Sequence, residues 1–481
     1  MITTRPHPFN SRANDAVRSY ILSRLNEIDS GTRTALIVDN DIYSNVTWQE
    51  GRAGRYFEGN NILVKIEGRN PELKAVLFSA HYDSVSTAYG ATDDGMGVVT
   101  LLQLITYFSK NTPSRTVVFN INNGEEDGLY GSHAFLSHPW SKEIGFFLNL
   151  EGAGAGGVPI VFRTSSYEVT QALKTTSHPH GSVFSSDTFA LGLIRSRTDY
   201  SVYTAAGMSG LDFAFYQRRS YYHTMRDTIS NLNGPGSLWL FMDSSLSIGR
   251  SLSQIDSPET GRGLPLHFDL NLLSPPFSEE APLKVLFYQA VNLTEQSSEV
   301  QLTGVEGYIQ KVVSQIPSTW QHPISCEADA LSRLTRCKWN STTAITKDMV
   351  SLDTEVIRSG EATLTVKGQN TRFCRILFDR PVLAFHVNGS AGEVRHGYSF
   401  PSNGTTELQL WSRERSKPFV VDVSWPQNET LQGRASCGWS DSQDWEDHIP
   451  AFKEILDFLP SWSLVSKRDH GLVEASLEFS L

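Results

Sequence analysis

Short apolar runs alternate with helical patterns over the first half of the chain, and this alternation restricts the possible fold more than any other feature. The runs that predict strands span residues 61–68, 74–80, 115–121, 145–150, 158–162 and 211–215. Residues 15–28, 98–110 and 236–252 repeat apolar positions at helical spacing. Because strands that alternate with helices build parallel sheets, we predict an α/β domain over residues 1–256, with a mixed, mostly parallel sheet flanked by helices.

The second half has a different pattern. From about residue 282, segments such as KVLFYQAV, ATLTVKG and FVVDVSW alternate apolar and polar residues and are separated by Gly, Pro, Asn and Ser. Period-two alternation with turn residues is typical of strands in a sandwich. The pattern predicts a predominantly β domain over 282–481 with minor helices at 305–316 and 450–459, joined to the first domain by a proline-containing linker at 257–281.

The length of the chain indicates the number of domains, and its net charge argues against nucleic-acid binding. A chain of 481 residues exceeds the length at which one hydrophobic core keeps growing, so two domains are expected. The formal net charge is -11 and the isoelectric point is near 5.7. Phosphate-backbone binding requires clustered Lys and Arg, and the sequence has no such cluster. We therefore expect no nucleic-acid partner.

Five segments rich in acidic residues and histidine occur in the first half: HYDS (81–84), ATDDGMG (91–97), NNGEEDG (122–128), LNLEG (148–152) and YYHTMRDT (221–228). Three of them follow or close predicted strands. Since ligands of open α/β sheets bind beyond the carboxyl ends of the strands, we expect these segments to meet at one edge of the sheet.

Histidine and carboxylates together are the ligands that zinc accepts, and a hydrolytic two-metal site also needs a bridging carboxylate and a base. Asp93 is the predicted bridge, because its turn is rich in small residues that let the backbone approach the metals. Glu125 is the predicted general acid/base, and its neighbour Glu126 the predicted ligand. Asp83 is placed to hydrogen-bond His81 and fix its tautomer.

Each of these residues also has an ordinary structural interpretation. A lone histidine at a strand end is more often a satisfied polar residue, and an acidic pair is usually solvated. His223 could belong to an aromatic cluster, and Asp199 and Asp227, which we predict to support the ligands, could be loop acids. Glu151 is harder to explain in this way, because a carboxylate that ends a buried strand is costly unless it is paired or metal-bound.

The motifs HYDS, DDG, GEE, NLEG and YYHT, in this order and with HPFNSRAND (7–15) near the start, resemble the leucine-aminopeptidase-like dizinc metallopeptidases. Within that family they are most similar to the fungal vacuolar membrane protease branch; the motifs cover residues 8–256, and the tail resembles the branch loosely. The resemblance implies peptide substrates, aminopeptidase-type cleavage and two zinc ions per chain. It implies the ligands His81, Asp93, Glu126, Glu151 and His223, with Glu125 as the base and Tyr222 as an oxyanion donor.

This chain departs from the resembled family in two respects. Many aminopeptidases of the family have Asp where this chain has Glu151, which affects metal spacing and the recognition of a free substrate amine. The resembled branch also carries membrane spans, whereas no stretch here reaches the roughly 18 to 20 apolar residues of a span. We expect the lumenal parts of a vacuolar membrane protein, with membrane association only through segments absent from this chain.

Cysteines and glycosylation sequons support a lumenal compartment. Six Asn-X-Ser/Thr sequons are present, at Asn45, Asn292, Asn340, Asn388, Asn403 and Asn428. The four cysteines, Cys326, Cys337, Cys374 and Cys437, all lie in the second half and predict two disulfides. Three pairings are open, and proximity in sequence favours Cys326 with Cys337. The amino terminus, however, has no apolar run that could serve as a signal peptide.

Other functions remain as alternatives. A glutaminyl cyclase-like transferase on the same fold would hold a single zinc. A non-catalytic receptor or scaffold would have lost ligands, whereas all expected ligand types are present here. A serine hydrolase of α/β type would need a GxSxG elbow, and the first half contains none.

Overall fold

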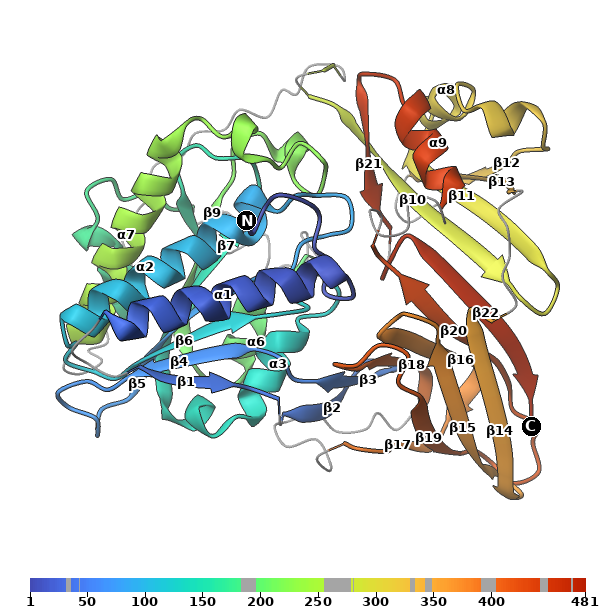
Figure 1. Cartoon of the computed structure of the whole chain (residues 1–481), viewed down its shortest axis with the longest axis horizontal. Helices are drawn as coiled ribbons and strands as arrows, with labels where there is room; N and C mark the ends of the chain where they lie inside the picture. The colour runs from blue at the N-terminus through green and yellow to red at the C-terminus, as the bar shows by residue number, and fades with distance from the viewer. Residues whose placement is uncertain are drawn as a thin grey trace. The chain divides into compact units, whose positions relative to one another are not determined.

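The structure is a computed structural model of the whole chain. It describes residues 1–31, 36–42, 44–182, 196–254, 278–279, 281–328, 334–341, 348–390, 404–441, 449–468 and 470–481. The chain divides into two compact units (Figure 1). Unit 1 comprises Met1–Phe9, Ala13–Asp41 and Asn60–Pro276, and unit 2 comprises Asn10–Arg12, Ile42–Gly59 and Phe277–Leu481.

Unit 1 is built on one mixed sheet. Its strands within the described residues are β1 (Ile37–Asn40), β4 (Ile62–Ile66), β5 (Ala75–His81), β6 (Val117–Asn122), β7 (Ile144–Gly152), β8 (Ile160–Thr164) and β9 (Ser209–Phe215), in the order β1-β4-β6-β5-β7-β9-β8. The central strands β6, β5, β7 and β9 run parallel. The outer strands β1, β4 and β8 pair antiparallel with their neighbours. The predicted α/β class with a mixed, helix-flanked sheet is confirmed.

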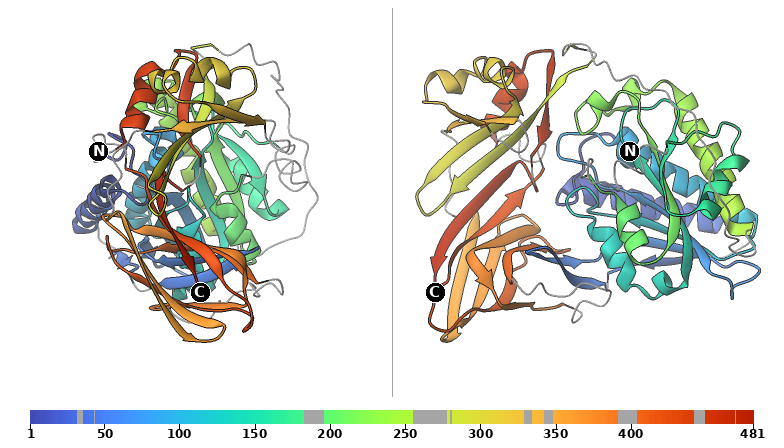
Figure 2. Two further views of the ribbon diagram at one scale, coloured as in Figure 1. Left: turned by 90° about the vertical axis from the view of Figure 1, so that its right-hand side faces the viewer. Right: turned by 180° about the vertical axis from the view of Figure 1, so that it is seen from behind.

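Helices cover both faces of this sheet, because its central strands are buried on both sides. On one face, α1 (Arg12–Ser30), α2 (Met96–Lys110) and α7 (Pro235–Gln254) share a core with alternate strand residues such as Val76 and Phe78. On the other face, α3 (Tyr130–Ser137) and α6 (Asp199–Ala205) pack against Leu77 and Phe147. Figure 2 shows this layering from behind.

The described residues of unit 1 also form shorter helices. They are the π-helical turn η1 (Ala91–Gly95), α4 (Tyr167–Gln171) and the 3₁₀ turns η2 (Pro139–Glu143), η3 (Ala172–Thr175), η4 (Arg219–Tyr221) and η5 (Ile229–Asn231). In the part of the chain that the structure describes, none of the helices combines the length and apolar character needed to cross a membrane.

Unit 2 is predominantly β, as predicted. A long sheet has the order β12-β13-β11-β10-β22-β20-β16-β18-β3-β2, with β21 paired to β10, and a second sheet has the order β14-β15-β19-β17. Apolar residues of both sheets form one core, which makes this part of the unit a sandwich. The strands are β2 (Asn45–Glu50), β3 (Ala53–Glu58), β10 (Leu283–Asn292), β11 (Ser297–Val305), β12 (Ser325–Ala328), β13 (Leu334–Asn340), β14 (Val350–Arg358), β15 (Glu361–Gly368), β16 (Phe373–Val382), β17 (Ala384–Val387), β18 (Thr405–Trp411), β19 (Phe419–Ser424), β20 (Gln432–Trp439), β21 (Ser463–Lys467) and β22 (Val473–Ser480).

Within its described residues, unit 2 has the helices α8 (Ile309–Val313) and α9 (Pro450–Phe458) and the 3₁₀ turn η6 (Pro317–Trp320). The helix predicted at 450–459 is therefore present, and the one predicted at 305–316 is shorter than expected. Both predicted disulfides form: Cys326 pairs with Cys337 and Cys374 with Cys437. Each joins neighbouring antiparallel strands at facing positions.

The hairpin β2–β3 belongs to unit 2, although it lies within the stretch that the sequence assigns to the first domain. Strand β3 pairs in parallel with β18. Phe57 is fully buried and stacks on Trp411, with ring centroids 4.6 Å apart. A Cβ on Gly54 would lie within 2.5 Å of Phe385, so only glycine fits where the hairpin meets the core. The alternating sequence NVTWQE and AGRYFE around Gly51 was the signal for this hairpin.

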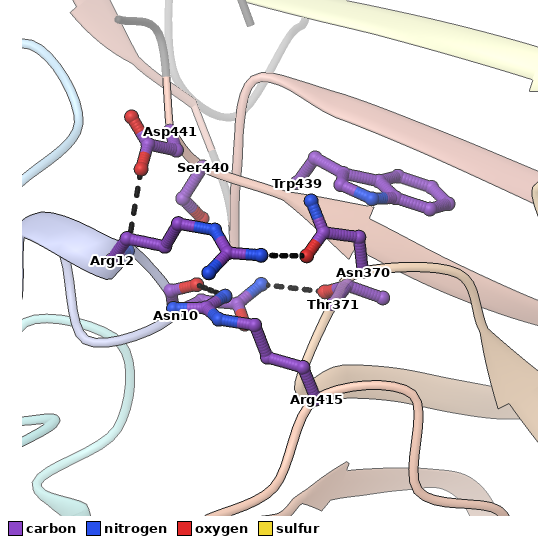
Figure 3. A pocket seen from close by; sticks show the side chains of 8 residues that line it. All are labelled: Asn10, Arg12, Asn370, Thr371, Arg415, Trp439, Ser440 and Asp441. Atoms are coloured by element: carbon purple, nitrogen blue, oxygen red, sulfur yellow. Dashed lines mark hydrogen bonds between the residues drawn. The ribbon is translucent and has the colours of Figure 1, made fainter. Parts of the chain in front are cut away.

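Residues Asn10–Arg12 also belong to unit 2 (Figure 3). The side-chain amide of Asn10 donates to the hydroxyl of Thr371 and to the carbonyl of Gly438, each at 2.8 Å. Arg12 donates to Oδ1 of Asn370 at 2.9 Å. The domain boundary is thus not a single point in sequence. Of the predicted linker 257–281, only 278, 279 and 281 lie within the described residues.

We expect the hairpin to stabilise unit 2. Replacing Phe57 with Ala should lower the free energy of unfolding of this unit by about 3–5 kcal/mol, because a buried aromatic ring and its packing are lost. Denaturant unfolding of the full chain, followed by tryptophan fluorescence, measures this. The matched control Arg52→Ala removes an exposed side chain of the same hairpin and should change stability by no more than about 0.5 kcal/mol. Equal stability of the two variants would contradict the assignment.

Candidate metal centre

The parallel strands bring the predicted ligands to one edge of the sheet in unit 1. His81 is the last residue of β5, and Glu151 lies near the end of β7. Glu126 follows β6, and His223 lies in the loop after β9 and η4. Asp93 lies in η1, the turn before α2. The carboxyl ends of neighbouring parallel strands meet at one edge, which is why residues so distant in sequence converge.

Their side chains form two overlapping groups. The His81 group consists of His81, Asp93 and Glu151, and the His223 group consists of Asp93, Glu126 and His223; in each, the candidate ligand atoms lie within 4.8 Å of one another. Nε2 of His81 is 3.3 Å from Oδ1 of Asp93, and Nε2 of His223 is 3.1 Å from Oδ2 of the same residue. Asp93 therefore turns one oxygen towards each group.

Backbone hydrogen bonds hold Asp93 in this orientation. Oδ1 of Asp227 accepts from the amide of Thr92 at 2.8 Å, and Oδ2 accepts from the amide of Asp93 at 3.2 Å. The turn also packs directly on β7, since a Cβ on Gly152 would lie 2.4 Å from the carbonyl oxygen of Thr92. Glycine after Glu151 thus permits the close approach of the two segments. Burial raises the pKa of Asp227 to about 7.

Asp83 connects two of the ligand-bearing segments. Its Oδ1 accepts from the amide of Gly124 at 2.9 Å, and its Oδ2 accepts from the amide of Glu126 at 3.3 Å. Oδ1 also lies 3.5 Å from Nδ1 of His81, and the backbone carbonyl of Asp83 lies 2.9 Å from the same nitrogen. The contact with His81 matches the placement expected from the sequence, and the contacts with the loop after β6 were not foreseen.

The protonation of the buried carboxylates indicates what the site can hold. Burial, and next the negative charge of Glu151, raises the pKa of Glu125 well above its usual value. Burial also raises the pKa of Glu151 to about 8. Burial opposes ionisation of Asp93 too, but hydrogen bonds with His223 and His81 lower its pKa. Buried carboxylates ionise readily beside positive charge, so this donor set fits divalent cations.

Two further predicted residues lie near the centre in different ways. Tyr222 stacks on His223, with ring centroids 3.7 Å apart, and the guanidinium of Arg219 lies 4.5 Å from the centre of the Tyr222 ring. Asp199 is fully buried and accepts a hydrogen bond from Asn122 at 2.6 Å. Asp199 belongs to neither ligand group, and burial raises its pKa to about 6.

A cavity of about 410 Å³ adjoins the cluster. It is lined by the carboxylates of both groups and Glu125, by the apolar side chains of Ile160, Phe162 and Phe215, and by Arg197 and Arg219. The apolar wall could not be predicted from the sequence, because β8 and β9 lie side by side only in the folded sheet.

Sequence reasoning also missed Asp94 and Asn149. Asp94 is buried, and its carboxylate accepts from the amides of His81 at 3.3 Å and Gly97 at 3.0 Å. Asn149 donates to Glu151 at 3.1 Å. Its place two residues before Glu151 on a predicted strand was an available signal, because such residues share a face.

Two family models match the chain. Residues 61–247 match the model described as peptidase family M28, and residues 283–475 match the vacuolar membrane protease C-terminal domain. The chain combines an M28 peptidase domain with a vacuolar membrane protease C-terminal domain. The predicted resemblance is confirmed, and the match to the M28 peptidase family supports a metallopeptidase.

Fungal proteins named vacuolar membrane protease are similar to this chain. That of Schizophyllum commune is 26% identical over an alignment of 840 residues, which covers all of this chain and 93% of the relative. Those of Laccaria bicolor and Schizosaccharomyces pombe are 54% and 41% identical over 56% and 61% of this chain. The matched regions span only 27% and 34% of the length of these two relatives.

Solved structures similar to the chain include two aminopeptidases. The Legionella pneumophila LapA aminopeptidase is 15% identical with a TM-score of 0.42, and the match covers 53% of this chain and 69% of that one. BSAP, a zinc aminopeptidase from Bacillus subtilis, is 20% identical with a TM-score of 0.34, covering 41% of this chain and 51% of that one.

Proposed function

We propose that the M28 domain is a two-zinc metallopeptidase of aminopeptidase type. The observation that carries the proposal is the pair of ligand groups that share Asp93. Each group offers one imidazole nitrogen and two carboxylate oxygens, which are donors that zinc accepts. A carboxylate with one oxygen facing each group has the arrangement that a bridged pair of cations requires.

The residues divide the chemistry of peptide hydrolysis among them. Two zinc ions held by the groups would polarise the substrate carbonyl and make water more acidic. Glu125 belongs to neither group, so it is free to accept the proton of the attacking water and deliver it to the departing amine. The carbonyl carbon gains a C–O bond and loses its C–N bond. Burial raises the pKa of Tyr222 well above its usual value. Its hydroxyl therefore stays protonated and can donate a hydrogen bond to the oxyanion.

The exopeptidase mode is supported by the character of the cavity. Carboxylate oxygens of Asp93, Glu125, Glu126 and Glu151 line one part of it, and those that do not bind the cations would accept hydrogen bonds from the α-amino group at the start of a peptide. Apolar side chains of β8 and β9 line another part, and they would accept an apolar side chain of the substrate.

Zinc content separates this proposal from its alternatives. We expect two zinc ions per chain, loss of peptide hydrolysis on chelation and recovery on adding zinc. At zinc concentrations 100-fold above the dissociation constants, the free energy of unfolding should rise by about 2.7 kcal/mol for each zinc ion bound. Metal analysis, a peptidase assay and thermal unfolding measure these quantities. A single zinc with cyclisation of amino-terminal glutamine would indicate the cyclase, and absence of hydrolysis in the zinc-loaded chain would indicate a scaffold.

Removing the proposed base should slow turnover strongly while the metal stays bound. Glu125→Gln should lower kcat by a factor of about 10²–10⁴, the usual contribution of a general base, while the zinc content stays at the wild-type level. The matched control Glu72→Gln changes an exposed glutamate and should leave kcat unchanged. A Glu125→Gln enzyme within threefold of wild type would refute the assignment. In the same assay, acetylating the substrate α-amine should prevent cleavage by the wild-type enzyme, and unimpaired cleavage would point to another mode.

We further propose that both units face the lumen of the vacuole. The two disulfides support this, as do the exposed sequon residues Asn340, Asn388 and Asn428. Asn45 is partly buried and donates to the carbonyl of Gly389 at 3.1 Å, so we expect less modification there. Asn403 lies outside the described residues.

Glycosylation tests this location. The chain expressed through a fungal secretory pathway should shift in electrophoretic mobility after endoglycosidase treatment. Each of Asn340→Gln, Asn388→Gln and Asn428→Gln should reduce the shift, whereas Asn233→Gln, at an exposed asparagine outside any sequon, should not. Unchanged mobility of the wild-type chain would count against lumenal exposure of these sites.

A further inference from the structure

Asn149 lies two residues before Glu151 on β7, so both side chains leave the same face of the sheet. Nδ2 of Asn149 is 3.1 Å from Oε1 of Glu151 and 3.1 Å from Oδ1 of Asp212. Asn149 and Asp212 are fully buried, and Glu151 is 5% exposed. Because a side-chain amide has two N–H donors, Asn149 can give one hydrogen bond to each carboxylate.

Asp212 and Arg163 continue this arrangement across the sheet. Asn149 on β7 faces Asp212 on β9, which in turn faces Arg163 on β8. Nε of Arg163 donates to Oδ2 of Asp212 at 2.8 Å, and a second guanidinium nitrogen contacts the same oxygen. The hydroxyl of Thr198 also donates to this oxygen, at 2.9 Å. We call Asn149, Asp212 and Arg163 the amide row.

The two carboxylate oxygens of Glu151 have different contacts, and only one of them is bonded to the amide row. Oε1 accepts the hydrogen bond of Asn149, whereas Oε2 is the oxygen that lies 3.7 Å from Nε2 of His81. We propose that the amide row is a positioning device, which holds Glu151 so that Oε2 is presented to the cation of the His81 group and Oε1 is turned away. The inference rests on the proposed two-zinc site.

The charge of Arg163 makes the row possible. Asp212 is a fully buried carboxylate close to a second one, and such a pair is costly unless a cation compensates it. Arg163 supplies that cation on the side of Asp212 away from Asn149, which leaves the other oxygen of Asp212 to fix the amide. A fixed amide is useful beside a glutamate, because the side chain of Glu has one more rotatable bond than that of Asp, and the hydrogen bond to Oε1 removes this freedom.

Zinc affinity at the two groups tests the proposal in the full chain. Asn149→Ala should weaken zinc binding at the His81 group about 10- to 100-fold, the usual effect of removing a partner of a metal ligand. The His223 group should keep its affinity. At intermediate free zinc, set with a competing chelator, the variant should hold one zinc where the wild type holds two. Asn149→Asp keeps the side-chain volume but places a third carboxylate beside Asp212 and Glu151, and it should lose at least as much affinity.

The matched control is Asn120→Ala. Asn120 is an equally buried asparagine of β6, and its amide donates to the hydroxyl of Tyr203 at 3.0 Å and not to a candidate ligand. This variant should bind two zinc ions with wild-type affinity. Thermal unfolding in excess chelator shows whether each variant is folded.

A double-mutant cycle with Glu151→Asp tests whether Asn149 affects zinc affinity through Glu151. Shortening residue 151 withdraws the carboxylate from Asn149, so adding Asn149→Ala to Glu151→Asp should weaken binding by less than threefold further. Two zinc ions bound at wild-type affinity in the folded Asn149 variants, or fully multiplicative effects in the cycle, would overturn the proposal. Failure of the wild-type chain to bind two zinc ions would instead reject the proposed function on which it rests.

Discussion

The candidate metal site of unit 1 is organised around the carboxylate of Asp93. Its two oxygens face two histidines, His81 and His223, that are far apart in the sequence of the domain. One oxygen lies 3.3 Å from His81 and the other 3.1 Å from His223. A single carboxylate can serve both groups only if its backbone is held firmly. Asp227 holds it through the amides of Thr92 and Asp93, and Gly152 lets the turn lie against β7.

The buried polar side chains around the cluster fix the orientation of the candidate ligand side chains. Asp83 ties His81 to the loop that carries Glu125 and Glu126, and Asn149 fixes one oxygen of Glu151. These supports lie on strands or directly after them, where the backbone is already constrained by the sheet. Among the described glutamates that line the pocket, Glu125 stands outside both ligand groups, which is the position that the proposed proton carrier needs.

Unit 2 shows how far sequence order can depart from domain order. The hairpin β2–β3 lies between β1 and β4 of unit 1 in sequence, but β3 extends the long sheet of unit 2 beside β18. Three residues of β3 explain this placement: Phe57 stacks on Trp411, Tyr56 joins the hydrophobic core of unit 2, and Gly54 leaves room for Phe385. The sequence-based boundary between the two domains was placed where the hydrophobic pattern changes. That pattern indicates the type of secondary structure in a segment but not the sheet that the segment joins.

The sequence by itself determined the class of each unit, the five candidate ligands and the four cysteines available for two disulfides, but not how these cysteines pair. Local period, residue chemistry and strand ends carry that information, because they depend on neighbours along the chain. Tertiary structure alone decided that Asp93 faces both histidines, that Ile160 and Phe162 wall the cavity, and that Arg163, Asp212 and Asn149 stand in register behind Glu151. Those relations depend on strand order and on the register between strands, which is set by packing between segments far apart in sequence.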